Sequence, residues 1–549
     1  MRNRRLAISA AVIAASVGLI PGIAHADDPA RGDASGMSVP DLSEAAAENF
    51  RTFTSPADRS VRKTPPTTEG KATAQAESAG NPDLAVGLGA YNISAHSLDL
   101  DTSINSAPDA QLSVTIAWGD GTTSQKNVVG SIEFATEHNY AELGTYKVTV
   151  TVTDAANSTS ASNSVAVTTA GSDFTPYGPT RLLDTRNGTG AAQAKVAPYS
   201  SSRVKIGGNG AIPAGVSAVV LNVTVTNTTS GGHVTAFPSG STRPTTSNVN
   251  FAPGQTVPNL VIVPVGKDGY VQLYNGGWES IDLIADVTGY FTRTASSGYT
   301  PMAPVRFADT REGLGTARGQ LAGQASFGLQ IGGTRGVPAG VTAVALNVTV
   351  TNPREAGHLT AYPSGQQAPT ASNVNFSAGQ TIANSVIVPV GADGKINIRN
   401  GAWMPTDVIV DVVGYYSTAG EGSYLSFTPG RMFDTRDYGP MEGRSYIWAD
   451  MSPDEPNITG FVLNTTVTNP GGPGFLAVAP DPNSLWQYDN GKDNWPTPPT
   501  SSTLNFTAGK TVPNLVQAST GDNGIVDFWN QSDNDIDLIV DVFGYYDKN

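Results

Sequence analysis

Apolar and polar residues alternate with a period of two along most of the chain that follows residue 83. In residues 145–153, Tyr146 and three valines fall on one face of an extended strand, while Lys147 and the threonines fall on the other. This period is typical of a β-strand with one buried face. The continuously apolar residues 260–265 predict a buried strand. Because Gly and Pro are frequent and no period of 3.6 residues is sustained, the pattern predicts an all-β protein.

The first 26 residues follow a different pattern. Three arginines precede an apolar run over residues 6–20, which a Pro-Gly pair and the small-x-small sequence Ala24-His25-Ala26 then end. This order is typical of a cleaved secretory signal peptide, and the run is too short and too interrupted by Ser and Gly for a membrane anchor. No later apolar run reaches spanning length. We therefore expect a secreted, extracellular protein without a transmembrane segment after signal cleavage.

Residues 27–82 are rich in Ala, Ser, Thr, Pro and charge. They offer too few apolar groups to offset the entropy lost on folding, so we predict a disordered linker. A short helix over residues 42–53 is the alternative.

A first folded module is predicted over residues 83–170. Its residues Trp118-Gly119-Asp120-Gly121, His138-x-Tyr140 and Gly144-Thr145-Tyr146 lie between or at the start of alternating strands. Together they resemble a PKD domain, which implies an immunoglobulin-like β-sandwich that serves outside cells as a spacer or adhesion module without catalysis. We expect Trp118 and Tyr146 in the core and His138 in a turn. Acidic side chains near turns, Asp99, Asp101 and Asp120, are expected to be solvated or to cap turns, with calcium binding as the alternative.

The rest of the chain is a threefold internal repeat. The motif Asp-Thr-Arg recurs at Asp184, Asp309 and Asp434, each 125 residues after the last (309 − 184 and 434 − 309). A unit of this length is the size of a domain. We predict three tandem, independently folding β-sandwich or jelly-roll-like domains over residues 173–292, 298–418 and 423–549. They resemble tandem domains of unknown function in secreted bacterial multi-domain proteins, which implies fold and location only.

Composition narrows the chemistry. The chain has no cysteine, which excludes disulfides, thiolate metal sites and cysteine nucleophiles. The formal charge is −15, and loss of the three signal-peptide arginines makes it −18 (−15 − 3). Such an acidic chain is a poor partner for nucleic acid.

Charged residues recur at the same positions in all three copies. Arginine forks in the opening segment suit the two aspartates that lie four residues apart in the closing strand, so we predict a structural ion-pair network that joins the two segments. A glycosidase-like acid pair is the alternative, disfavoured because the acids lie on apolar strands. The set is Arg181, Asp184, Arg186, Asp282 and Asp286, then Arg306, Asp309, Arg311, Asp407 and Asp411, then Arg431, Asp434, Arg436, Asp537 and Asp541.

Aromatic residues are the candidates for ligand binding. Trp278 and Trp403 follow Asn-Gly-Gly and Asn-Gly-Ala turns, where exposed rings can stack on sugars, whereas copy three has Asp533 there. Copy three also carries an insertion over about residues 481–499 with Trp486, Tyr488 and Trp495. This loop either binds a ligand or packs on its own domain.

Catalytic motifs are weak. His233 and His358 occupy equivalent strand positions, where we expect them to face solvent, and no histidine shows ligand spacing with another. We expect no catalytic residue, metal or cofactor. The sequence predicts a non-enzymatic protein that binds extracellular polysaccharide or cell-surface components, with a structural spacer as the rival and a hydrolase as the weakest reading.

Overall fold

The computed structural model describes residues 22–24, 47–63, 81–452 and 456–549. Within these residues nearly every regular element is a β-strand, and the sheets are antiparallel, so the all-β expectation is confirmed. The chain divides into two compact units. One comprises residues 48–171 with 293–295 and 549, and the other comprises residues 172–292 and 296–548 with the chain up to 47. Each unit is described by itself.

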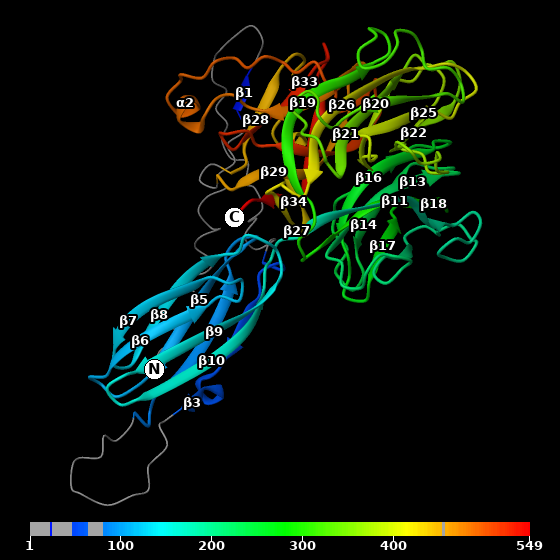
Figure 1. Ribbon diagram of the computed structural model, residues 1–549. Coiled ribbons are helices and arrows are strands. Elements are labelled where there is room, and N and C mark those ends of the chain that lie inside the picture. Colours follow the sequence, from blue (N-terminus) through cyan, green and yellow to red (C-terminus); the bar gives the residue numbers. More distant parts are fainter. Residues whose placement is uncertain (1–21, 25–46, 64–80, 453–455) are drawn as a thin grey trace, which may run out of the picture. The chain divides into compact units, whose positions relative to one another are not determined.

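The first unit is a two-sheet sandwich, drawn from blue to cyan in Figure 1. One sheet has the order β2-β4-β5-β8 and the other β3-β10-β9-β6-β7. The alternating valines of β9 point into the core beside Trp118, as their period predicts. The strands are β2 (Thr52–Ser55), β3 (Val61–Lys63), β4 (Ala85–Asn92), β5 (Ser97–Asn105), β6 (Gln111–Ala117), β7 (Thr123–Val129), β8 (Ile132–Asn139), β9 (Thr145–Asp154) and β10 (Thr159–Thr168).

The expectation of a disordered linker over residues 27–82 is wrong for its middle part. β2 pairs with β4, β3 pairs with β10, and the 3-10 helix η1 (Ala57–Arg59) joins them. Buried Ser55 donates to Asn163 Oδ1 at 2.7 Å. The open sheet edges supply backbone partners that composition alone does not reveal. Residues 27–46 and 64–80 lie outside the described residues, and the alternative helix over 42–53 is not formed where it is described.

The predicted signal peptide lies mostly outside the described residues. Its residues Gly22–Ala24 form β1, which pairs with the edge strand β28 of the second unit. Cleavage after Ala26 would remove this strand.

The second unit contains three sandwiches of eight strands, each with one chain-order pattern. Counted from one to eight, the strands make one sheet of order 1-8-3-6 and one of order 2-7-4-5, which is the jelly-roll arrangement. Figure 1 draws sandwich 1 in green, sandwich 2 from green to yellow and sandwich 3 from orange to red. We call the 1-8-3-6 sheet the axial sheet and the other the outer sheet.

Every strand of sandwich 2 begins 125 residues after its equivalent in sandwich 1, whereas in sandwich 3 only the first strand keeps this spacing. Sandwich 1 has β11 (Asp173–Asp184), β12 (Ser201–Lys205), β13 (Ala218–Thr226), β14 (Gly232–Pro238), β15 (Val249–Phe251), β16 (Val257–Pro264), β17 (Tyr270–Asn275) and β18 (Asp282–Thr292). Sandwich 2 has β19 (Gly298–Asp309), β20 (Ser326–Gln330), β21 (Ala343–Thr351), β22 (Gly357–Pro363), β23 (Val374–Phe376), β24 (Ile382–Pro389), β25 (Lys395–Asn400) and β26 (Asp407–Ser417). Sandwich 3 has β27 (Ser423–Asp434), η2 (Thr435–Asp437), β28 (Tyr446–Asp450), β29 (Ile458–Thr468), β30 (Gly474–Pro480), α2 (Leu485–Asp489), β31 (Leu504–Phe506), β32 (Val512–Ser519), β33 (Ile525–Asn530) and β34 (Asp537–Asp547).

The axial sheets are buried on both faces. In β13, Val219, Leu221 and Val223 enter the core of sandwich 1, whereas Ala218 and Val220 enter a second core that all three sandwiches share. Thr224 and Thr226 of the same strand are also buried, because the neighbouring sandwiches cover that face.

Seven aromatic rings occupy the shared core. The first strand of each sandwich contributes one ring, and the last strand contributes one in sandwiches 1 and 2 and two in sandwich 3. A glycine of the last strand faces the first-strand ring, and a Cβ at Gly289 would collide with the ring of Phe174. This contact explains the repeated Asp-Val-x-Gly sequence. The rings belong to Phe174, Phe291, Tyr299, Tyr416, Tyr424, Phe543 and Tyr546.

Hydrogen bonds from equivalent asparagines to serine carbonyls of the next sandwich close the three sandwiches into a ring. Asn222 donates to Ser372 O of sandwich 2 at 2.7 Å, Asn347 donates to Ser502 O of sandwich 3, and Asn464 donates to Ser247 O of sandwich 1 at 2.9 Å. Each sandwich therefore offers the same donor to the next. A repeated head-to-tail contact that closes after three steps defines a pseudo-threefold axis.

Candidate functional site

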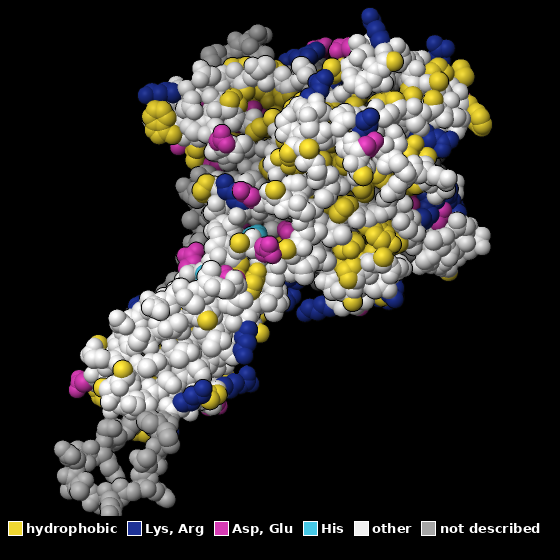
Figure 2. Space-filling view, viewed as in Figure 1, with side chains coloured by type: hydrophobic (Ala, Val, Ile, Leu, Met, Phe, Trp, Pro, Cys, Tyr) yellow, Lys and Arg dark blue, Asp and Glu magenta, His cyan; other side chains and the backbone are white. Residues whose placement is uncertain are grey.

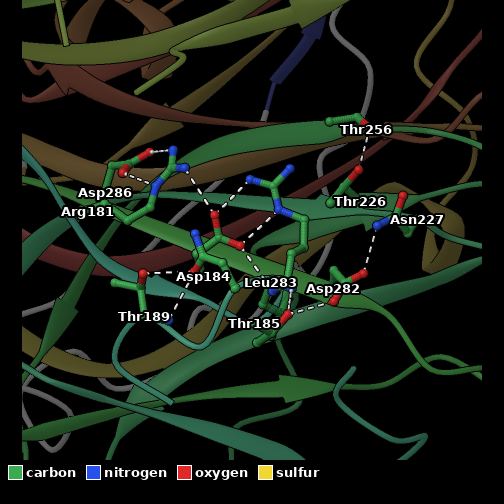
Figure 3. A network of polar contacts seen from close by, with 12 residues as sticks. Arg181, Asp184, Thr185, Thr189, Thr226, Asn227, Thr256, Asp282, Leu283 and Asp286 are labelled. Carbon is green, nitrogen blue, oxygen red and sulfur yellow. Dashed lines mark hydrogen bonds and ion pairs between the residues drawn. The ribbon is translucent and has the colours of Figure 1, made fainter. Parts of the chain in front are cut away.

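The recurring charged residues meet at the junction of the first and last strands of each sandwich. Figure 3 shows Arg181 between two carboxylates. Its Nε and Nη2 donate to Asp286 at 2.9 and 3.1 Å, and its Nη1 donates to Asp184 at 3.1 Å. Arg186 holds Asp184 from the other side at 2.9 and 2.8 Å. A bidentate arginine fork on each carboxylate makes a clasp between β11 and β18.

The other two sandwiches repeat this clasp. Arg306 donates to Asp411 at 2.9 Å, and Arg431 donates to Asp541 at 2.5 Å. The first-strand aspartate is again held by the second arginine, Arg311 on Asp309 and Arg436 on Asp434.

The other aspartate of each closing strand makes no ion pair with these arginines, which corrects part of the predicted network. In sandwich 1 this residue is Asp282. Asp282 accepts instead from the Thr185 hydroxyl at 2.8 Å and the Asn227 amide at 2.7 Å. The Thr185 hydroxyl also accepts from Leu283 N, so it links the first strand to the last strand without an ion pair. Asp407 is held in the same way by Thr310 and Asn352, and Asp537 accepts from Asn469.

The aspartates of the clasp have shifted pKa values of opposite sign. Burial raises the pKa of Asp286 and Asp411, and it raises the pKa of Asp541 to about 6, against the opposing effect of arginine. The hydrogen bond from Arg186 lowers the pKa of Asp184. These carboxyl groups are almost inaccessible, since Asp286 is 1% exposed. The arrangement suits a structural clasp better than an acid pair that must touch a sugar.

The two turn tryptophans are the most exposed large apolar side chains described. Trp278 is 76% exposed and Trp403 is 81% exposed. A buried asparagine at the end of the preceding strand fixes each turn: Asn275 accepts from Gly277 N, and Asn400 accepts from Ala402 N, both at 2.9 Å. The backbone that carries each tryptophan is therefore held, while its ring faces solvent.

The two tryptophans have different neighbours. The ring of Tyr199 stands edge-on to Trp278, with centroids 5.6 Å apart. Around Trp403, Glu355 accepts from the backbone nitrogens of Trp403 and Met404. The exposed Gln324 accepts from Arg399 at 2.7 Å. Polar side chains beside an exposed indole suit a ligand that combines an apolar face with hydroxyl groups.

His233 and His358 are half-buried, which corrects the expectation that they face solvent. Each ring lies against the glycine that begins the tryptophan turn, Gly276 or Gly401, where a Cβ would collide with it. Burial lowers the pKa of both histidines. They support the turns as neutral rings.

Sandwich 3 has an ion pair where the others have tryptophan. Asp533 accepts from Arg444 Nε at 2.8 Å, and both side chains are more than half exposed. Asn530 fixes this turn as Asn275 does, by accepting from Ser532 N. The turn is thus retained and only its exposed surface differs.

The insertion of sandwich 3 packs mainly on its own outer sheet. Tyr488 is buried, stacks on Trp448 at 4.2 Å and donates to Asp481, so it is withdrawn from the candidate binding residues. Trp495 lies edge-on to Tyr446 and is 39% exposed. Trp486 remains 58% exposed, with Lys492 over its ring. Two of the three aromatic residues of the loop therefore pack on their own domain, as the alternative expected, and only Trp486 remains largely exposed.

A buried acid pair under the insertion was missed by the sequence reading. Asp527 is 1% exposed. Burial raises the pKa of Asp527 well above its usual range, and the neighbouring buried Asp481 adds to the rise in its pKa. Asp527 lies on β33 opposite Trp448 and Ala479. A period of two puts it on the same face as Ile525 and Trp529, so a lone acid in an apolar run was the available signal.

Replacing Asp527 by asparagine should flatten the pH dependence of stability. The raised pKa means that folded Asp527 keeps a proton that the unfolded chain releases above about pH 4. Its contribution is therefore complete below that pH and is lost as the pH rises through the folded pKa. Urea unfolding of Asp527→Asn between about pH 5 and pH 8 should show a smaller loss than the parent chain. Exposed Asp489→Asn is the control, and equal slopes for both variants would contradict the expectation.

In the first unit, His138 lies in β8 and not in a turn. Its ring stacks on Trp118 at 4.3 Å, and its Nε2 contacts Asp120 at 2.8 Å. Hydrogen bonds from Thr122 and His138 outweigh burial and lower the pKa of Asp120 to about 2. Asp99 accepts from the Tyr91 hydroxyl at 2.8 Å. These carboxylates thus serve local contacts, and among the described residues no cluster of three or more His, Asp or Glu side chains could hold a metal ion.

Comparisons identify the first unit. The family model described as a PKD domain matches residues 82–169. Residues 82–169 are a PKD domain. The sandwich, its core Trp118 and the edge strands agree with the immunoglobulin-like fold that the resemblance implied. The PKD domain covers 88 of 549 residues (82 to 169), so it assigns no family to the three sandwiches.

The remaining comparisons add little. No curated protein matches the chain. The solved structure described as "Life in the extremes: atomic structure of Sulfolobus Turreted Icosahedral Virus" aligns over 64% of this chain and 84% of its own, with 9% identity and a TM-score of 0.12. That score is too low to bear on the fold. None of the helices in the described part of the chain has the length and apolarity needed to cross a membrane.

Proposed function

We propose that the protein is a secreted, non-enzymatic adhesion protein that binds extracellular glycan through Trp278 and Trp403. The PKD domain supports an extracellular setting, because such domains occur in extracellular proteins. The signal-peptide pattern supports export independently.

The observation that carries the proposal is the exposure of two tryptophans at equivalent turns. Burial in the interior stabilises a protein by about 1.5–3 kcal/mol for each large apolar side chain, and an exposed indole does not contribute this free energy. Two sandwiches present this side chain on a turn that a buried asparagine holds. Figure 2 shows hydrophobic side chains in several separate groups on the visible face, rather than in one broad patch. Isolated aromatic rings suit sugar rings better than a flat protein partner.

The net charge of the chain limits the class of polysaccharide that it can bind. A chain of formal charge −15 repels anionic polymers at low salt. We therefore assign a neutral polysaccharide, whose sugar rings offer apolar faces for stacking and hydroxyl groups for Glu355 and Gln324.

A pull-down with insoluble cellulose, chitin and peptidoglycan tests this function. The full secreted chain should bind cellulose or chitin, which are uncharged, more strongly than peptidoglycan, whose stem peptides carry carboxylates. The double variant Trp278→Ala/Trp403→Ala should lose at least about tenfold in affinity, or about 1.4 kcal/mol. Tyr438→Ala, which removes an exposed aromatic side chain of sandwich 3 outside the tryptophan turns and the insertion, is the matched control and should bind as the parent does. No binding to any of the three would favour the rival, a structural spacer without a ligand.

A further inference from the structure

We propose that Trp278 and Trp403 bind one polysaccharide strand or surface at the same time, so that a single protein chain binds its polysaccharide at two points. The inference rests on the proposed function and adds the geometry and stoichiometry of the contact. It concerns the second unit alone.

The ring of sandwiches gives both tryptophans equivalent places. The three asparagine contacts repeat around one pseudo-threefold axis, so equivalent residues of different sandwiches lie at the same height along that axis. Trp278 and Trp403 are equivalent, since both follow the seventh strand of their sandwich and its terminal asparagine. They therefore face the same end of the unit.

The shared core holds the spacing of the two turns. The first strands of the three sandwiches bridge one another, at Phe174 with Ser297, Tyr299 with Gly422, and Ser172 with Tyr424. Their aromatic rings pack together in the shared core. A rigid frame lets the second tryptophan bind without the ordering cost of a flexible linker.

The third position of this end is closed to stacking. Asp533 and Arg444 stand where sandwich 1 has Trp278 and Tyr199, and their ion pair presents charge in place of an aromatic face. Two sites rather than three thus follow from the side chains that occupy the three turns. Linked sites exceed either single affinity by about 10²–10⁴ when both can engage.

The test compares single and double variants on the polysaccharide that the parent binds best and on its soluble hexasaccharide. On the polymer, Trp278→Ala and Trp403→Ala should each lower affinity by about 100-fold, and the double variant should not bind. On the hexasaccharide, calorimetry should give two sites for the parent and one for each single variant, with similar Kd. Because both side chains are exposed, all variants should retain the parent's melting temperature.

The outcomes separate the two proposals. Single variants that lose only about half of the bound polymer, or one single variant that binds as the parent does, would overturn bivalence while leaving glycan binding intact. Failure of the parent chain to bind cellulose, chitin and peptidoglycan overturns the proposed function and bivalence with it. Tyr438→Ala again serves as the control that leaves both readouts unchanged.

Discussion

Replacing Tyr416 by alanine should lower the unfolding free energy of the three-sandwich unit by about 3–5 kcal/mol. Its ring is fully buried in the shared core, 4.3 Å from the ring of Phe174 and 4.9 Å from that of Tyr299. Its hydroxyl meets the Tyr546 hydroxyl at 2.8 Å and accepts from Gln517 at 2.7 Å. Truncation leaves a cavity that borders all three sandwiches, so none can relax alone.

Differential scanning calorimetry checks this expectation. The transition of the three-sandwich unit should move to lower temperature as one event, while that of the PKD domain stays in place. Tyr416→Phe keeps the ring and removes only the hydroxyl, so it should cost about 1–3 kcal/mol through the polar groups left unsatisfied. If the alanine and phenylalanine variants melt together, the ring does not support the shared core.

Replacing Arg431 by alanine should have the second large effect, a loss of about 3–5 kcal/mol at neutral pH. Asp541, 1% exposed, would keep its buried carboxylate without the fork that now reaches it at 2.5 Å. Asp434 would lose one of its two arginines. Removal of one partner leaves an uncompensated buried charge, which costs more than the pair itself contributes.

The loss should depend on pH in a defined direction. The pKa of Asp541 is already raised to about 6 by burial, and without Arg431 it rises further. Stability from a raised carboxyl pKa is complete below the unfolded value of about 3.9 and is lost as the pH rises through the folded value. Urea unfolding should therefore show a larger deficit at about pH 8 than at about pH 5. Arg444→Ala removes an exposed ion pair and should cost about 0–1 kcal/mol at either pH, whereas an equal cost for both variants would contradict the clasp.

Strand type and repeat order could be predicted from the sequence because the governing signals are local. The period of two in β9 and the recurring Asp-Thr-Arg motif are visible in short stretches. The placement of Arg181 near Asp286 was also predictable, since a buried carboxylate needs a partner and arginine offers a matching fork. Asp282 was wrongly placed in the ion-pair network because its hydrogen-bond donors, Thr185 and Asn227, are uncharged and cannot be recognised as its partners from charge pattern alone.

The shared core could not be predicted, because burial of the second face depends on other sandwiches. Val220 and Thr224 in β13 look like ordinary positions of one strand until a neighbour covers them. Tyr488 shows the same limit: an aromatic residue in a polar loop looks exposed, yet Trp448 and Asp481 draw it inward. Both outcomes depend on contacts between segments far apart in the sequence.

Because the three sandwiches belong to one chain, a substitution in one copy does not have to occur in the other two. In a homotrimer every substitution appears three times around the axis, and a change that suits one position must be tolerated at all three. Here the asparagine contacts are retained in each copy while the outer sheets diverge: Ser201, Arg203 and Tyr274 of sandwich 1 correspond to Tyr446, Trp448 and Trp529 of sandwich 3. Covalent linkage thus allows one copy to specialise under its insertion without altering the frame that holds all three.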